Sequence, residues 1–245
     1  MPHFFVDEEI ESSEYSLFGE DGRHIAKSLR MKQGENLTLC SPSGTVHNCV
    51  VEKVEGDFVG VRILSSEQSE TEPSVKVTLY QALPKGDKME LIIQKAVELG
   101  VYEIIPVRTK RVVVKLDEKK ETKKIARWQQ IAESGAKQSG RGIIPEVKPV
   151  MSFKDALDYA KSLEGVLIPY EKAEGMHKTR EIIKGLKGKK SVGIFIGPEG
   201  GFDEQEIEAA MNSGVEPVTL GRRILRTETA GLTMLSILMF EFEEE

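Results

Sequence analysis

The pattern of apolar and polar residues changes near residue 73. Before that point, apolar residues fall in short runs separated by turn-forming residues, which predicts β-strands at residues 4–6, 36–40, 46–51 and 58–64. One helix is expected near residues 23–30. Residues 65–73 are polar and aperiodic, as is typical of a linker. The sequence therefore predicts a small β-barrel or curled sheet as a first domain, over residues 1–72.

Beyond residue 73, strands and helices alternate. Strands are predicted at residues 75–80, 102–107, 165–169, 192–196 and 218–220. Apolar residues recur at helical spacing between them, in helices that are expected to begin near Asp87, Ser152 and Asp203. Asp87 with Glu90, and Asp203 with Glu206, have the spacing of capping pairs. This alternation predicts an α/β domain over residues 73–245, with a largely parallel sheet and helices on both faces.

Two loops near the carboxyl terminus stand out chemically. The first, Gly197-Pro198-Glu199-Gly200-Gly201, follows a buried strand, and the second runs from Leu220 to Arg226 after the next short strand. Alone, the first could be a tight turn and the second a surface ion pair between Arg226 and Glu228. Both follow the carboxyl end of a strand, where open α/β sheets place ligands. The pair therefore favours a small-molecule site.

The net charge of −6 hides an uneven distribution of charge. Basic residues gather at residues 108–127 and again at residues 172–190. Binding of phosphate groups depends on local positive potential rather than on net charge. A solvated helix face is the better interpretation for residues 119–124, whereas an RNA-facing edge is equally reasonable for Arg108 to Lys115.

Composition restricts the compartment and the chemistry. The chain has no apolar run of 18 residues and no signal-peptide pattern at its start, so a cytoplasmic protein without a membrane anchor is expected. The two cysteines, Cys40 and Cys49, are interpreted as free core thiols. No metal-ligand cluster is evident, so no metal is expected.

The same loops carry a resemblance. The GPEGG loop and the later LGRRILRTETA segment resemble the RsmE family of RNA methyltransferases, within the knotted SPOUT superfamily. Further similar segments are residues 24–35, 85–90, 94–101 and 138–141. One departure is that the family often has paired histidines near its start, whereas here Arg23 precedes His24.

The resemblance implies a fold and an activity. The fold would be a SPOUT-type α/β trefoil-knot domain behind a PUA-like or OB-like β-barrel that clamps RNA. The apolar residues of 232–240 cover every face of the last helix, which suits a threaded or interface helix and equally a central core helix. The activity would be methyl transfer from S-adenosylmethionine to N3 of a uridine in 16S ribosomal RNA, by a homodimer that acts on an assembled small subunit.

Roles for individual residues follow from the same resemblance. Arg226 would stabilise negative charge on the uracil, and Glu228 would orient Arg226 or accept the proton. The glycines, Gly200 in particular, are expected to adopt positive φ and to let the backbone approach the cofactor. The cofactor would be bound by Pro169, Tyr170, Gly197, Pro198, Glu199, Gly200, Gly201, Leu220, Gly221, Ile224 and Leu225.

Phosphate contacts would come from Lys27, Arg30, Lys32, Arg108, Lys110, Arg111 and Arg141. Arg30 could equally cap the end of its helix. The sequence leaves two other functions to compare. A Rossmann-like oxidoreductase would need a Gly-x-Gly-x-x-Gly loop, which is absent. A non-catalytic RNA-binding assembly factor would not need the two glycine loops.

Overall fold

The computed structural model describes residues 1–114, 116–173 and 175–243. Its contacts divide the chain into two compact units. Unit 1 comprises Met1–Glu72 with Ala136–Ile144, and unit 2 comprises Pro73–Gly135 with Pro145–Glu245. The two units are described separately below.

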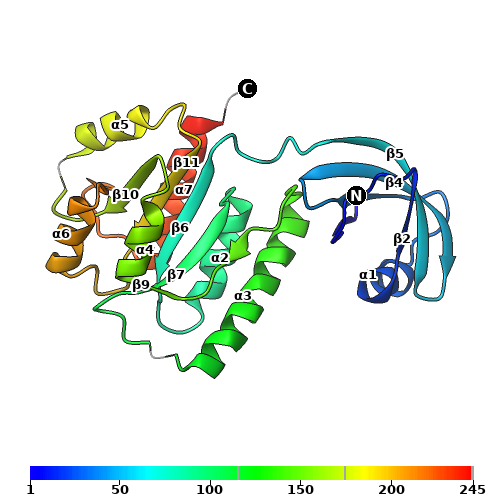
Figure 1. Cartoon of the computed structure of the whole chain (residues 1–245), viewed down its shortest axis with the longest axis horizontal. Helices are drawn as coiled ribbons and strands as arrows, with labels where there is room; N and C mark the ends of the chain where they lie inside the picture. Colours follow the sequence, from blue (N-terminus) through cyan, green and yellow to red (C-terminus); the bar gives the residue numbers. More distant parts are fainter. Residues whose placement is uncertain (115, 174, 244–245) are drawn as a thin grey trace. The chain divides into compact units, whose positions relative to one another are not determined.

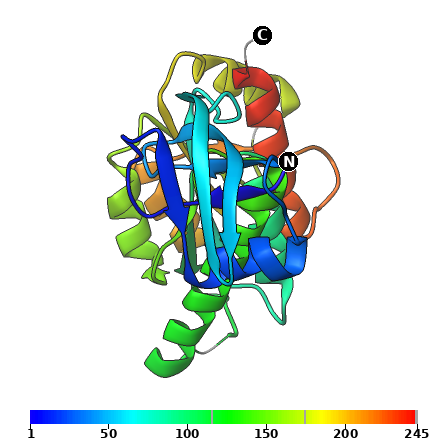
Figure 2. The same ribbon diagram turned by 90° about the vertical axis from the view of Figure 1, so that its right-hand side faces the viewer.

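Unit 1 is built on a five-stranded sheet of order β1-β3-β4-β5-β2. Its β1–β3 pair is parallel and its other pairs are antiparallel. Inward-facing residues of these strands form one core with Ile25, which is fully buried. Figure 2 shows these strands in blue to cyan. Their bounds are His3–Phe5 (β1), Glu14–Leu17 (β2), Asn36–Cys40 (β3), Thr45–Glu55 (β4) and Phe58–Gln68 (β5).

The helical segment of unit 1 begins earlier than the sequence predicts. Helix α1 (Gly19–Arg23) continues into a π-helical turn, η1 (His24–Leu29), which ends at Arg30. Arg30 has φ 54°, in the left-handed region, and it is the helix C-cap residue. This left-handed cap ends the helix in the way that a glycine usually does.

The expected linker is partly wrong. Strand β5 extends to Gln68, so residues 65–68 pair with β4 instead of leaving the sheet. These residues are polar because they are exposed, while their backbone groups are satisfied by the neighbouring strand. The sequence also missed β2, which pairs with β5.

Unit 2 contains a parallel sheet of order β12-β10-β11-β6-β7-β8, with β9 also paired to β7. The predicted α/β architecture with a parallel sheet is thus present. The short strand expected at residues 218–220 is present but lies two residues earlier, as β12. Strand bounds are Lys76–Ala82 (β6), Glu103–Arg108 (β7), Glu146–Val147 (β8), Met151–Ser152 (β9), Gly165–Pro169 (β10), Ser191–Ile196 (β11) and Glu216–Val218 (β12).

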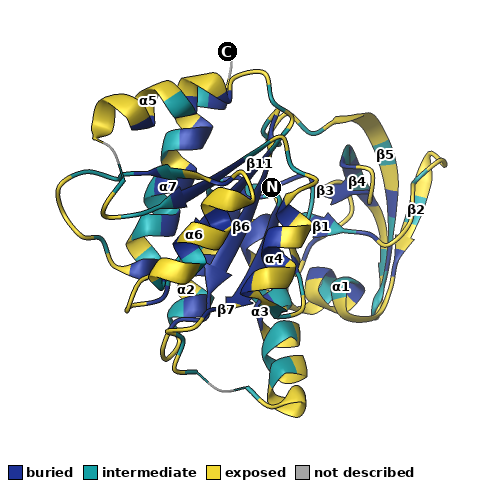
Figure 3. Ribbon diagram, turned by 60° about the vertical axis from the view of Figure 1, so that its left-hand side comes forward, coloured by how far each residue is buried: buried dark blue, intermediate teal, exposed yellow. Residues whose placement is uncertain are grey.

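Helices cover both faces of this sheet (Figure 1). On one face, α4 (Phe153–Ala160) and α6 (Glu204–Asn212) pack over the stacked rings of Tyr80 and Phe195, whose centroids lie 4.2 Å apart. On the other face, α7 (Thr227–Phe242) contacts β6, β11 and α2 (Lys88–Glu98). Figure 3 shows the strands buried between these layers. The remaining helices are α3 (Glu118–Ser139) and α5 (Met176–Gly185).

Helix starts agree only partly with expectation. Asp203 and Glu206 form the predicted capping box, and Ser152 caps α4. Asp87 is the N-cap residue of α2, but its side chain makes no capping hydrogen bond, so that prediction is wrong.

The apolar carboxyl-terminal helix is mostly buried. Met234, Leu235, Leu238 and Met239 are buried, whereas Phe240 is 88% exposed in the single chain. Within the described ranges, no helix is long and apolar enough to cross a membrane.

Candidate active site

A cavity of about 730 Å³ opens at the carboxyl edge of the unit 2 sheet. Its walls are the segments that follow β10, β11 and β12, together with the start of α7. Strands β12, β10 and β11 are parallel neighbours, so the segments that follow them converge at one edge. All the residues nominated for the cofactor lie in this wall: Pro169, Tyr170, Gly197, Pro198, Glu199, Gly200, Gly201, Leu220, Gly221, Ile224 and Leu225.

The loop at residues 197–202 is a tight turn in which the Gly201 amide donates to the Pro198 carbonyl at 2.9 Å. Gly201 has φ +66°, a conformation that residues with a Cβ disfavour. At Gly197 an added Cβ would lie 3.2 Å from the Phe202 ring. The expectation of positive φ at Gly200 is wrong: its φ is not in that region, and an added Cβ would meet Arg111 at an ordinary 3.6 Å.

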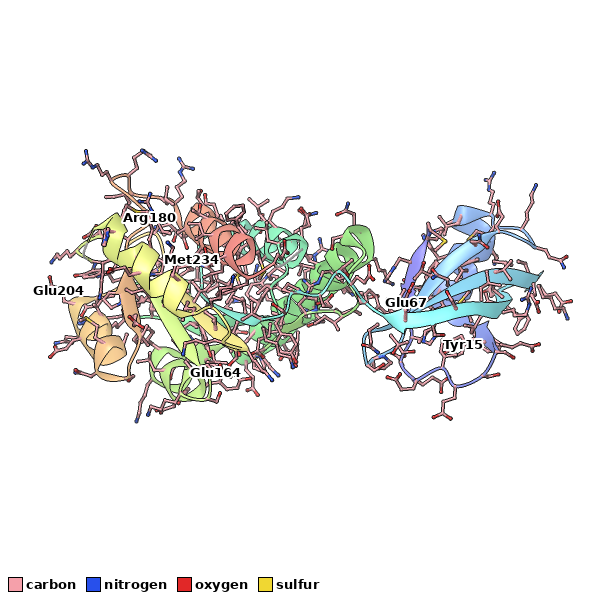
Figure 4. The ribbon with its side chains drawn as sticks, turned by 90° about the horizontal axis from the view of Figure 1, so that it is seen from above. Tyr15, Glu67, Glu164, Arg180, Glu204 and Met234 are labelled. Atoms are coloured by element: carbon pink, nitrogen blue, oxygen red, sulfur yellow. The ribbon has the colours of Figure 1, made fainter. Side chains whose placement is uncertain are left out.

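Two buried threonines hold the cavity loops. Thr227, the first residue of α7, accepts from the Gln81 amide at 2.9 Å and donates to the Gly197 carbonyl at 2.6 Å. Thr179 on α5 accepts from the Thr219 amide at 2.9 Å, which fixes the start of the loop that contains Leu220 to Arg226. This loop runs beside α5, where Figure 4 labels Arg180. Sequence reasoning missed both threonines because each acts on a residue far away in the chain.

Charged residues surround the opening. Arg226 lies in the wall and is exposed. Glu228 lies outside the wall and pairs with Lys88, at 3.4 Å. Among the residues that the structure describes, no ion pair joins Arg226 to Glu228, so the expected orienting contact is wrong.

Lys88 also binds Glu199, at 3.0 Å, and Lys88 itself belongs to the wall. The hydrogen bond to Glu199 raises the pKa of Lys88. Burial acts to raise the pKa of Glu199, but hydrogen bonds from its own amide, Lys88 and Lys85 leave that pKa below its ordinary value. The pair is therefore ionised at neutral pH.

A second cluster of charges supports the glycine loop from the β7–α3 connection. Arg111 donates to the Gly200 carbonyl at 2.9 Å and lies 3.6 Å from Asp203. Lys110 binds Asp203 at 2.9 Å, and this contact keeps the pKa of Asp203 below its ordinary value.

The residues nominated for RNA contact have different environments. Lys27 pairs with Asp57 at 2.8 Å, and Arg108 pairs with Glu121 at 3.2 Å. Arg30 and Lys32 are exposed. Lys115 lies outside the described residues.

Arg141 is a correction, because its side chain is only 4% exposed and it binds Glu72 through two hydrogen bonds of 2.8 and 2.6 Å. A side chain buried in this way has no surface to offer to a phosphate group. Within the described ranges, no group of three or more His, Cys, Asp or Glu residues is arranged to bind a metal ion.

Comparison with known proteins extends this picture. Residues 71–239 match the RNA methyltransferase domain family, and residues 18–64 match the RNA methyltransferase PUA domain family. The chain is 36% identical to ribosomal RNA small subunit methyltransferase E of Bacillus subtilis, over 99% of this chain and 98% of that protein. It is 40% identical to the enzyme of the same name from Mesomycoplasma hyopneumoniae, over 96% of this chain and 98% of that protein.

Solved structures agree with these relatives. Ribosomal RNA small subunit methyltransferase E of Neisseria gonorrhoeae, bound to S-adenosylmethionine, superposes with a TM-score of 0.86 at 34% identity and covers 98% of this chain and 97% of its own. A Legionella pneumophila protein described as a methyltransferase, in complex with the same cofactor, gives a TM-score of 0.84 at 35% identity, over 96% of each chain.

The parallel-sheet domain, its cavity and these matches define an RNA methyltransferase of the SPOUT class with an accessory PUA domain. Within that class, the chain belongs to the ribosomal RNA small subunit methyltransferase E family. The fold class and the family expected from the sequence are thus confirmed.

Proposed function

We propose that this protein transfers a methyl group from S-adenosylmethionine to N3 of a uridine in 16S ribosomal RNA. The observation that carries the proposal is the cavity, which has a volume suited to a small-molecule cofactor and contains every nominated cofactor residue. The glycine turn fits the cofactor as well, because a side chain at Gly197 or Gly201 would disturb the backbone that must approach it. Two relatives solved with this cofactor support the same reading.

Backbone groups of the 197–202 and 219–226 loops would read the adenine and ribose. Leu220 and Leu225 are only partly exposed and would provide the apolar slot. Ile224 is 87% exposed, so its side chain lies at the rim of the cavity. Tyr170 closes the wall from the β10 side, where its amide donates to the Val218 carbonyl at 2.8 Å.

The cofactor supplies an electrophilic methyl group, so the protein's task is to position the uridine and to manage its N3 proton. Arg226 can stabilise negative charge on the uracil carbonyls as N3 loses its proton. The resemblance implies that Glu228 could accept this proton, but Glu228 lies outside the cavity wall and pairs with Lys88. We therefore propose that Glu228 positions its charged neighbour, Lys88. A uridine in a loop or flipped from its stack would reach the cavity.

RNA contacts are proposed for both units. In unit 1, a PUA-like clamp would use Lys27, Arg30 and Lys32. In unit 2, Arg108, Lys110 and Arg111 would contribute from the β7–α3 connection. Arg111 and Lys110 already hold the glycine loop and α6, so they would bind phosphate with one face of each side chain. Arg141 is left out of this proposal because it is buried.

A second copy of the chain is proposed as a partner. Ile224 and Phe240 are 87% and 88% exposed, and Ile224 lies at the rim of the cavity. Covering them in a homodimer would remove large apolar side chains from water. We further propose an assembled small ribosomal subunit as the substrate and the cytoplasm as the location.

The experiment combines binding with transfer. Calorimetric titration with S-adenosylmethionine, in the presence of a chelator, should show one site, and NAD should show none. Tritiated methyl transfer should then be measured on small subunits that lack the modification and on naked 16S RNA. Absence of cofactor binding would overturn the proposal, and binding without transfer to either RNA would favour a non-catalytic assembly factor.

A further inference from the structure

Residues 85–90 resemble a family motif, yet none of the roles proposed above uses them. In the structure these residues form the turn into α2, with Gly86 at φ +64° and Lys88 as the first residue of the helix. The helix begins without a side-chain cap from Asp87. A carboxylate from a distant segment, Glu199 of the glycine loop, lies at this helix start instead.

One nitrogen joins three parts of the cavity. The Lys88 ammonium donates to Glu199 Oε1 at 3.0 Å and lies 3.4 Å from Glu228 Oε2. The same Glu199 oxygen accepts from the Lys85 amide at 3.1 Å. The side chains of Lys88, Glu199 and Glu228 are only 32%, 30% and 16% exposed. Lys88 therefore connects α2, the glycine loop and the first turn of α7.

The position of Lys88 is electrostatically unfavourable for the helix itself. A cation at a helix N-terminus opposes the helix dipole. Two carboxylates also lie within 3.4 Å of the one ammonium. Without that ammonium, two like charges would face each other in a partly desolvated space, which would push the glycine loop and α7 apart. These charges indicate that Lys88 stabilises the glycine loop and the start of α7 rather than α2.

We propose that Lys88 is a positioning residue, which holds the glycine loop and the start of α7 together so that the cavity is preorganised for its cofactor. The expected effect on cofactor binding rests on the proposed function, whereas the effect on the two segments does not. It assigns Glu228 a definite role: its carboxylate is the second anchor of Lys88, two residues along the chain from Arg226.

The test compares Lys88→Met with Lys95→Met. Lys95 lies on the same helix, pairs with Glu98 at 2.7 Å and is outside the cavity wall, so it is a matched control for loss of one charge. Hydrogen exchange of the cofactor-free protein is measured at residues 197–202 and 227–231. We expect faster exchange in both segments for Lys88→Met and no change for Lys95→Met.

Cofactor affinity gives the second readout. Lys88→Met should raise the Kd for S-adenosylmethionine by about tenfold, because the cofactor must then order segments that hydrogen bonds of Lys88 order in the wild type. Lys88→Arg keeps the charge and should recover most of the affinity. Lys88→Met combined with Glu228→Gln should bind more tightly than Lys88→Met alone, because one of the opposed charges is gone.

The outcomes separate the two proposals. If the wild type does not bind the cofactor, the proposed function fails, while the exchange data still decide the role of Lys88. If the wild type binds and Lys88→Met matches Lys95→Met in exchange and in affinity, the positioning role is wrong. Should Lys88→Met fail to fold, Glu199→Gln takes its place, with faster exchange expected at residues 197–202; unchanged exchange there would overturn the inference.

Discussion

At the scale of single residues, Arg226 has the strongest claim to act on the acceptor base. It is exposed, belongs to the cavity wall and is the N-cap residue of α7. Its carbonyl accepts from the amides of Thr229 and Ala230, at 2.9 and 2.8 Å, so its backbone is fixed, while the residue is exposed at the cavity wall. A fixed backbone with an available donor is the arrangement expected for a group that stabilises charge.

Substitution of this residue should separate chemistry from binding. Arg226→Ala is expected to lower methyl transfer by about 100- to 1,000-fold, the usual cost of losing one such donor, with nearly unchanged cofactor affinity. Arg226→Lys should recover little, because lysine lacks the planar fork. Single-turnover transfer and calorimetry on the same preparations measure both effects. Near-full turnover in Arg226→Ala would assign the residue to the capping of α7 alone.

The two thiols of unit 1 should be inert in the folded protein. Burial raises the pKa of Cys40 and of Cys49 from 9.0 to about 11. Neither should react with a thiol reagent at pH 8 until the protein unfolds. Because the folded pKa values are raised, folding stability should fall as the pH rises from 9.0 toward 11. Rapid labelling of one thiol in the native state would contradict this prediction.

At the scale of elements, the glycine turn can be tested through its backbone. Gly201 has φ +66°, whereas Gly200 has an ordinary φ and room for a Cβ. Gly201→Ala should therefore strain the turn and weaken cofactor binding by about tenfold, since strain of this kind costs about 1–3 kcal/mol. Gly200→Ala is the matched control and should bind within about threefold of wild type, since Ala adds only a Cβ. Equal affinities for the two variants would show that the turn tolerates side chains.

The sequence predicted the elements whose signals are local. Buried strands such as β10 and β11, and helices with a capping residue such as Ser152 or Asp203, were found because their apolar pattern and caps lie within a few residues. Strand β2 and the end of β5 were missed, because exposed polar strands are stabilised by backbone pairing with distant residues.

The candidate site was predictable in its backbone and less so in its side chains. Glycine and proline in loops after strands indicate a close approach of the backbone, and those residues do line the cavity. The contact of Lys88 with Glu199 spans 111 residues, so no local pattern reveals it. Arg141 shows the opposite error: the resemblance implies an RNA contact, but its partner Glu72, 69 residues away in the chain, buries it.

At the scale of the whole molecule, unit 1 is not continuous in the sequence. The segment Ala136–Ile144 belongs to unit 1, although it follows a large part of unit 2 in sequence. Arg141 anchors this segment, since its guanidinium and the Gly142 amide both bind Glu72. At Gly142 an added Cβ would collide with the Ser69 side chain, so the segment packs directly on the end of β5. Unit 1 is therefore completed only after most of α3 has been synthesised.

This arrangement predicts that Arg141 stabilises unit 1 and has no direct role in RNA binding. Arg141→Met keeps the aliphatic stem but leaves Glu72, itself 21% exposed, without its charged partner, and should destabilise unit 1 by about 3 kcal/mol. Arg127→Met, on α3 within unit 2, removes an exposed pair with Glu90 and should cost less than about 1 kcal/mol.

Different probes can report the two units separately. The single tryptophan, Trp128, lies in unit 2, so its fluorescence follows that unit during urea unfolding. Hydrogen exchange of the β3 and β4 amides follows unit 1. Arg141→Met should accelerate exchange in β3 and β4 well beyond the effect of Arg127→Met, and RNA affinity measured where both variants are folded should be unchanged. A loss of RNA affinity without accelerated exchange would show that Arg141 contacts RNA directly.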